Sequence, residues 1–137
     1  MDSVWTISAQ LPSFEPLKED IKTDVLIIGG GLAGLLCAWR LKQAGVDVVL
    51  VEADTICSGI TKNTTAKITS QHGLVYDTLI RKMGAEKTKL YLQANQDALQ
   101  QYRELCRKFD CDFEEQDAYV YALHDRQKID RELEALQ

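Results

Sequence analysis

Three glycines in the spacing Gly-x-Gly-x-x-Gly are the residues of this chain whose types and positions most clearly suggest chemistry. They are Gly29, Gly31 and Gly34, and Leu32 and Ala33 lie between the last two. In a phosphate-binding turn the first glycine permits the tight bend, the second lets the backbone approach a pyrophosphate, and the third lets a helix pack closely on a strand. Amide groups at the start of that helix then meet the phosphate charge. The spacing predicts a dinucleotide-binding turn.

An acidic residue follows this turn at the distance expected for a residue that binds a nucleotide ribose. Glu52, with Ala53 after it, ends an apolar run about 20 residues beyond the glycines. A carboxylate in this position accepts hydrogen bonds from ribose hydroxyls and repels a 2′-phosphate. No arginine follows it directly, so NADP is disfavoured. NAD and FAD both remain open, because both use this fingerprint.

The elements that must position these residues can be predicted from the flanking sequence. Residues 24–28 are apolar and rich in β-branched side chains without alternation, which predicts a strand buried on both faces. Residues 32–44 have helical character, and Gly45 is well placed to end that helix in a left-handed conformation. Residues 46–51 predict a second buried strand. A structural glycine turn without a nucleotide is the alternative, and the agreement of strand, helix and spacing disfavours it.

A polar segment rich in hydroxyl side chains, residues 53–74, follows the second strand. A loop of this length is uncommon in a compact domain and is usually functional or disordered. Hydroxyls and backbone amides in such a loop suit phosphate oxygens. A solvated surface connector is the alternative.

The remainder of the chain predicts mainly helices. We expect a short helix over residues 75–83 ended by Gly84, then a long helix over 86–109. Residues 111–115 and 118–123 predict two short strands, joined as a hairpin through residues 116 and 117. Asp125 is a plausible N-cap of a last helix, which we expect to be still running where the sequence stops. The buried stripe expected on the long helix comprises Leu90, Ala94, Ala98, Tyr102, Leu105 and Phe109.

These elements predict an α/β fold with three regions. Residues 1–22 form an N-terminal arm broken by Pro12 and Pro16, and residues 23–75 form the Rossmann-like βαβ unit, with its parallel sheet, and the loop after it. Residues 76–137 form a helical segment and the start of a mixed α+β substrate domain.

Composition limits the function classes. The 137 residues carry a formal net charge of −5, with 45% hydrophobic and 27% charged residues, which is close to an ordinary globular domain. An acidic balance gives no electrostatic footprint for nucleic acid, and no apolar run is long enough for a membrane span. The four cysteines form no CxxC pair and no metal-ligand constellation, so we expect free thiols, no metal and a cytoplasmic location.

An extended pattern around the glycines resembles the N-terminal signature of glutathione-reductase-type flavoproteins. The pattern is Gly29-x-Gly31-x-x-Gly34-x-x-x-Ala38-x-x-Leu41-x-x-x-Gly45-x-x-Val48-x-x-Val51-Glu52, continuing to Ser58-Gly59. Within that group it is similar to the D-amino acid oxidase and glycine oxidase superfamily of FAD-dependent oxidoreductases. The loop over residues 58–73 resembles a bacterial branch whose members often carry a C-terminal Rieske iron–sulfur domain. That branch commonly has Gly-His where this chain has Lys62-Asn63.

The resemblance implies FAD as cofactor, with Thr61, Thr65, Ala66 and Lys67 near its pyrophosphate or flavin. It implies hydride transfer to flavin from a small amine or amino acid, with a Rieske domain as a possible partner in the full-length protein. It assigns no catalytic residue here, because the family places much of its substrate domain further along. Two alternatives stay open, which are a truncated fragment without activity and an NAD-binding module.

Overall fold

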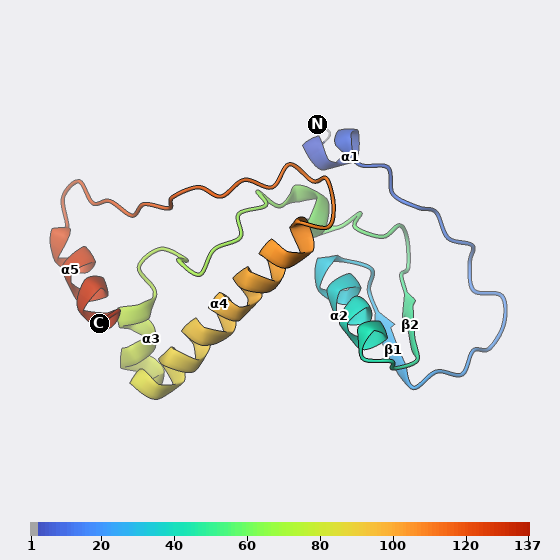
Figure 1. The fold of residues 1–137 in the computed structure, drawn as a ribbon, viewed down its shortest axis with the longest axis horizontal. Helices are drawn as coiled ribbons and strands as arrows, with labels where there is room; N and C mark the ends of the chain where they lie inside the picture. The colour runs from blue at the N-terminus through green and yellow to red at the C-terminus, as the bar shows by residue number, and fades with distance from the viewer. Residues whose placement is uncertain (1–2) are drawn as a thin grey trace. The chain divides into compact units, whose positions relative to one another are not determined.

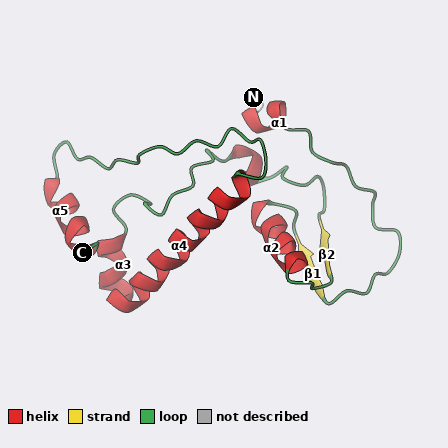
Figure 2. Ribbon diagram, viewed as in Figure 1, coloured by secondary structure: helices red, strands yellow, loops and turns green. Residues whose placement is uncertain are grey.

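The computed structural model describes residues 3–137 and contains two compact units, one ending at Ala66 and the other beginning at Lys67. Residues 67–75, which we predicted with the binding unit, belong to the second unit by their contacts. Figures 1 and 2 show the elements, which are α1 (Val4–Ser8), β1 (Val25–Ile28), α2 (Leu32–Gln43), β2 (Val48–Val51), the 3-10 helix η1 (Ile60–Asn63), α3 (Tyr76–Met83), α4 (Ala85–Cys106) and α5 (Arg126–Ala135).

The first unit is built on a strand–helix–strand arrangement. Strands β1 and β2 pair in parallel, with Val25 opposite Val48 and Ile28 opposite Val51. Helix α2 contacts both strands, as Figure 1 shows. The predicted order of elements is therefore present, and it is compatible with a Rossmann-like α/β fold.

The prediction that β1 is buried on both faces is wrong. Val25 and Ile27 are half-buried, whereas Leu26 is 55% exposed and Ile28 is 83% exposed. Side chains of a strand alternate between the two faces of its sheet, and α2 contacts this sheet of two strands. Burial in β1 therefore alternates along a run that is apolar throughout.

Helix α2 ends as the sequence predicts, in a left-handed glycine. Gly45 has φ +76°, and its amide donates to the carbonyl of Lys42 while the amide of Val46 donates to Leu41. This pair of hydrogen bonds is the Schellman motif. Val46 thus belongs to the end of the helix, which explains why β2 begins at Val48 and not at residue 46 as we predicted.

The second unit is helical in the part that the structure describes. Gly84, with φ +85°, separates α3 from α4, as predicted. The predicted buried stripe of α4 is wrong in its first half, where Leu90 is 71% exposed and Ala94 and Ala98 are also exposed. Of its last three residues, Tyr102 and Leu105 are half-buried, and Phe109, 63% exposed, lies beyond the end of the helix at Cys106. The less exposed positions of α4 are Thr88, Leu92, Asn95, Leu99, Tyr102, Arg103, Leu105 and Cys106. Helix α4 contacts α3, and the face of α4 that is less exposed shares only its last part with the predicted stripe.

The predicted hairpin over residues 111–123 is absent, so the second unit contains no strand within residues 67–137. Asp112 has φ +51°, a left-handed backbone conformation that no regular strand adopts. Glu115 instead pairs with Arg103 of α4, at 2.8 Å from its Oε1 to Nε. An isolated hairpin is marginal without a third strand or a packed helix, which accounts for its absence here.

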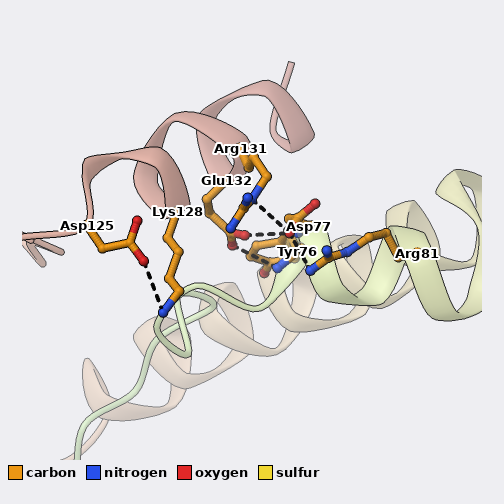
Figure 3. A network of polar contacts seen from close by, with 7 residues as sticks. All are labelled: Tyr76, Asp77, Arg81, Asp125, Lys128, Arg131 and Glu132. Atoms are coloured by element: carbon orange, nitrogen blue, oxygen red, sulfur yellow. Dashed lines mark hydrogen bonds and ion pairs between the residues drawn. The ribbon is translucent and has the colours of Figure 1, made fainter.

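Helix α5 is held on α3 by a buried carboxylate (Figure 3). Glu132 is 6% exposed, and its two oxygens accept from the amides of Tyr76 and Asp77 at 2.7 and 2.9 Å. Asp125 occupies the predicted N-cap position but makes no capping hydrogen bond and instead pairs with Lys128. The helix ends at Ala135, so the expectation that it runs to the last residue is wrong.

Within residues 3–137, no helix combines the length and apolar character needed to cross a membrane. The four cysteines are free thiols, as we predicted.

Candidate functional site

A cavity of about 610 Å³ lies in the first unit, where the glycine turn meets the end of β2. Its size is in the range of small-molecule and cofactor sites. It is lined by the glycine turn, the first turn of α2, Glu52 and the loop that follows β2. The lining residues are Ile28, Gly29, Gly31, Leu32, Ala33, Gly34, Glu52, Cys57, Ser58, Gly59, Ile60, Thr61 and Thr64.

The three motif glycines meet different constraints. Gly29 has φ +109°, a conformation that L side chains rarely adopt. A Cβ on Gly34 would lie 2.0 Å from the carbonyl oxygen of Gly29, so the turn and the helix can approach only without a side chain there. A Cβ on Gly31 would meet only Thr61 Oγ1, at 3.4 Å. The protein itself therefore leaves room at Gly31, on the side that lines the cavity.

The first turn of α2 presents amide groups to this cavity. The first four amides of an α-helix have no partner within the helix, and here the amide of Leu32 donates to Thr61 Oγ1 at 3.0 Å. The first turn contains no acidic side chain, and the last turn carries Arg40 and Lys42. These charges suit the helix dipole, whose positive end favours an anion at the N-terminus.

Glu52 is fixed in orientation by backbone amides. Its Oε2 accepts from Gly30 at 2.6 Å, and its Oε1 accepts from Ala53 at 2.8 Å and Asp54 at 3.2 Å. The hydrogen bond from Gly30, and after it the one from Asp54, hold the pKa of this carboxyl below its ordinary value. A carboxylate offers about four lone-pair positions, so a charged acceptor remains for a hydroxyl donor in the cavity.

The loop after β2 is tied back onto the glycine turn. The amide of Cys57 donates to the carbonyl of Gly30 at 2.9 Å, and Cys57 itself has φ +59°. A Cβ on Gly30 would lie 2.8 Å from Ile56 Cγ2, so this glycine, outside the predicted set, is also required by close packing. The loop therefore forms one wall of the cavity.

Seven of the site residues predicted from the sequence line this cavity. They are Gly29, Gly31, Leu32, Ala33, Gly34, Glu52 and Thr61. Ala53 does not line the cavity, but its amide orients Glu52. Thr65 and Ala66 are not among the lining residues, although the amide of Ala66 donates to Thr64 Oγ1 at 3.2 Å. Lys67 belongs to the second unit.

Six lining residues were missed by the sequence reasoning, and they are Ile28, Cys57, Ser58, Gly59, Ile60 and Thr64. The hydroxyl-rich composition of the loop pointed to the segment but not to its members. Ser58 and Gly59 stood in the extended signature and could have been nominated from it. Nothing in the spacing indicated Cys57, because its place depends on the backbone turn that brings it to Gly30.

Comparison with protein families gives the chain a match to the family described as "FAD dependent oxidoreductase" (DAO), over residues 24–137. Among curated proteins, the chain is 43% identical over 138 residues to the "Putative Rieske 2Fe-2S iron-sulfur protein YhfW" of Bacillus subtilis (strain 168). It is 28% identical over 116 residues to gamma-glutamylputrescine oxidoreductase of Escherichia coli (strain K12). These matches cover 98% and 83% of this chain.

The chain spans 27% of the length of each of these two relatives. A shorter match, 41% identical over 46 residues, is to thiamine thiazole synthase of Aeropyrum pernix, and it covers 34% of this chain and 17% of that protein. No solved structure matches the chain significantly.

The family match begins at the first residue of the predicted strand and covers the whole cavity. It confirms the resemblance that the extended glycine pattern indicated, and it decides for FAD over NAD as the cofactor. The chain belongs to the DAO family of FAD-dependent oxidoreductases, and FAD is the cofactor of that family.

Proposed function

We propose that the cavity of the first unit binds FAD, and that the chain is the FAD-binding portion of an oxidoreductase that acts on an amine or amino acid. The observation that carries the site is the joint placement of the α2 amide terminus and the amide-fixed Glu52 on one cavity. The gamma-glutamylputrescine oxidoreductase of Escherichia coli, 28% identical over 116 residues, supports the amine class.

The residues of the chain divide the binding between them in this proposal. The amides at the start of α2 receive the pyrophosphate, and Gly31 leaves room for its approach. Glu52 accepts a ribose hydroxyl, while Thr61 adds a hydroxyl beside the first turn of the helix. Thr65, Ala66 and Lys67 follow this loop and are proposed to approach the remainder of the cofactor. When bound, FAD would supply the acceptor for a hydride from the carbon that bears the amine.

The electron acceptor is proposed by analogy. The relative with 43% identity is named as a Rieske 2Fe-2S iron–sulfur protein, so a Rieske domain in the full-length protein would be a suitable acceptor. Because this chain covers 27% of that relative, the activity, substrate and partner of the whole protein are all part of the proposal.

Substitution of Gly31 tests the cofactor site. Gly31→Ala adds a Cβ that the protein alone accommodates, at 3.4 Å from Thr61 Oγ1, so the free energy of unfolding without FAD should change little. Binding of FAD, titrated by its fluorescence, should weaken by at least about tenfold, since about 1.4 kcal/mol of lost contact is enough. FAD binding that is unchanged in Gly31→Ala would contradict the placement of the pyrophosphate.

Reduction of the bound flavin tests the substrate class. The FAD-loaded chain is mixed with candidate amines, amino acids and 2-hydroxy acids without oxygen, and the absorption band of oxidised flavin is followed. Loss of the band with amines alone would support the proposal, and loss with 2-hydroxy acids alone would contradict it. A chain that binds FAD and is reduced by none of them would favour the alternative of a binding portion without activity.

A further inference from the structure

A tryptophan from the N-terminal arm holds the loop that walls the cofactor cavity. Trp5 Nε1 donates to the carbonyl oxygen of Thr64 at 2.8 Å, across 59 positions of sequence. Trp5 is 39% exposed, whereas its neighbours in α1, Val4 and Ile7, are 61% and 77% exposed. Trp5 is thus more covered than the other two large apolar side chains of this short helix, and α1 contacts η1.

Helix α1 depends on this contact for its position. It has five residues and is capped by Ser3, whose hydroxyl accepts from the amide of Trp5 at 3.4 Å. A helix of this length is unstable alone in water, and such helices are held by tertiary packing. The side chains after it, including Leu11 and Phe14, are exposed. The contacts of α1 with η1 are therefore what fix its place.

The residue that Trp5 holds belongs to the cavity. Thr64 is the C-cap of η1 and one of the lining residues. At the other side of the same short helix, Thr61 Oγ1 accepts from the amide of Leu32 in the first turn of α2. The segment Ile60–Thr64 is thus held at two points, by Trp5 at its end and by Leu32 at its beginning.

We propose that Trp5 is a positioning residue for the cofactor, which acts by fixing η1 and thereby holding Thr61 at the start of α2. Trp5 does not line the cavity, so it acts through Thr64. If the loop is already ordered before FAD binds, binding does not have to order it, and the affinity is higher. This inference rests on the proposed FAD site, and it adds that the N-terminal arm belongs to that site.

The first test removes the N–H donor and keeps an aromatic ring. Trp5→Phe should weaken FAD binding to the full chain about threefold to fivefold, because one net hydrogen bond is worth about 1 kcal/mol and about 1.4 kcal/mol is a factor of ten. The matched control is Trp39→Phe, the same substitution in α2, at a residue that does not line the cavity. The control should bind FAD as the unsubstituted chain does.

A second measurement reports the loop without cofactor. Lys62 lies within η1, so trypsin cleavage after Lys62 in the FAD-free protein reports how often this segment opens. Cleavage should be several-fold faster in Trp5→Phe than in Trp39→Phe. Equal cleavage rates in the two variants would overturn the inference, whatever their FAD affinity.

A double-mutant cycle separates positioning from a general loss of stability. The proposed route runs from Trp5 through Thr64 and η1 to Thr61. If this route operates, Trp5→Phe should weaken FAD binding much less in a Thr61→Val background than in the unsubstituted chain. Equal weakening in both backgrounds would overturn the route through Thr61. Failure of the unsubstituted chain to bind FAD would contradict the proposed function itself, and that result is distinct from unchanged binding in Trp5→Phe.

Discussion

At the scale of single residues, the site depends on one carboxylate and three glycines that have different tasks. Glu52 is charged and fixed by the amides of Gly30, Ala53 and Asp54. Gly34 is required by the fold, since its missing Cβ is what allows the carbonyl of Gly29 to lie there. The fold itself tolerates a Cβ at Gly31, and the absence of a side chain there matters only when a ligand approaches the backbone. Stability and binding can therefore be separated by substitution.

Substitution of Glu52 should change the acid sensitivity of the protein. Its pKa in the folded state lies below its ordinary value of 4.5, so the unfolded chain binds the proton more readily. The carboxylate therefore stabilises the fold above that ordinary value, and this contribution is lost as the pH falls through the lowered pKa. Stability of the unsubstituted protein, followed by urea unfolding from pH 6 downward, should fall more than that of Glu52→Gln.

The control for this measurement is Glu19→Gln, at an exposed position of the arm. It should keep the acid sensitivity of the unsubstituted protein. If Glu52→Gln and Glu19→Gln lose stability in parallel below about pH 4.5, the backbone hydrogen bonds of Glu52 do not contribute as described.

Substitution of Gly34 should unfold or strongly destabilise the first unit. In Gly34→Ala the new Cβ would lie 2.0 Å from a backbone oxygen, which cannot move without distorting the turn. Overpacking of this kind costs about 1–3 kcal/mol, and we expect the upper part of that range in the free energy of unfolding. Gly59→Ala is the matched control, since no atom lies within 4 Å of its added Cβ. Equal stabilities of the two variants, measured in urea, would contradict the packing argument.

At the scale of elements, a buried aromatic ring and a buried carboxylate both join helices of the second unit. Tyr76 of α3 is buried, 3% exposed, and its ring meets that of Tyr91 edge to face, with the ring centroids 6.4 Å apart. Burial is the main cause that raises the pKa of its hydroxyl. Glu132 of α5 supplies acceptors for the first-turn amides of α3 (Figure 3), as a capping side chain does within one helix.

Removal of the Glu132 carboxylate should therefore lower the free energy of unfolding more than removal of an exposed carboxylate does. Glu132→Ala leaves the amides of Tyr76 and Asp77 without their acceptor, and a buried group left unsatisfied costs about 1–3 kcal/mol. The control is Glu134→Ala, on the same helix and exposed, which should cost less than about 0.5 kcal/mol. Urea unfolding measures both, and equal costs would show that the contact between α5 and α3 does not depend on this carboxylate.

At the scale of the whole molecule, the cavity belongs to one compact unit. All of its lining residues precede Ala66, where the first unit ends. The network around Glu132 lies in the other unit. Substitutions in the two places share no contact residues, and such substitutions normally have additive effects.

We therefore expect the binding of FAD to be independent of the Glu132 network. Glu132→Ala should bind FAD within about twofold of the unsubstituted chain, since unrelated sites couple by less than about 0.5 kcal/mol. Hydrogen exchange with FAD present should slow in the glycine turn and in residues 57–64, and should remain unchanged in α5. Slower exchange in α5 on addition of FAD would show that the helices of the second unit also take part in binding.

Much of the first unit was predictable because its signals are local. The positive φ of Gly29 and Gly45, the order of strand, helix and strand, and the spacing to Glu52 all follow from neighbouring residues. The predictions were wrong where contacts with another part of the chain determine burial or secondary structure. The face of α4 that is covered, the exposure of Ile28 and the missing hairpin at residues 111–123 all depend on which element packs nearby.

The sequence by itself determined the kind of site, because a glycine turn, a helix terminus and an acid at fixed spacing act through the backbone and need few distant contacts. Only the tertiary structure decided which residues close the site. Three hydrogen bonds bring together residues up to 59 positions apart. They join Cys57 to Gly30, Leu32 to Thr61, and Trp5 to Thr64. Such contacts depend on how the chain folds back on itself, which no local pattern of residue types records.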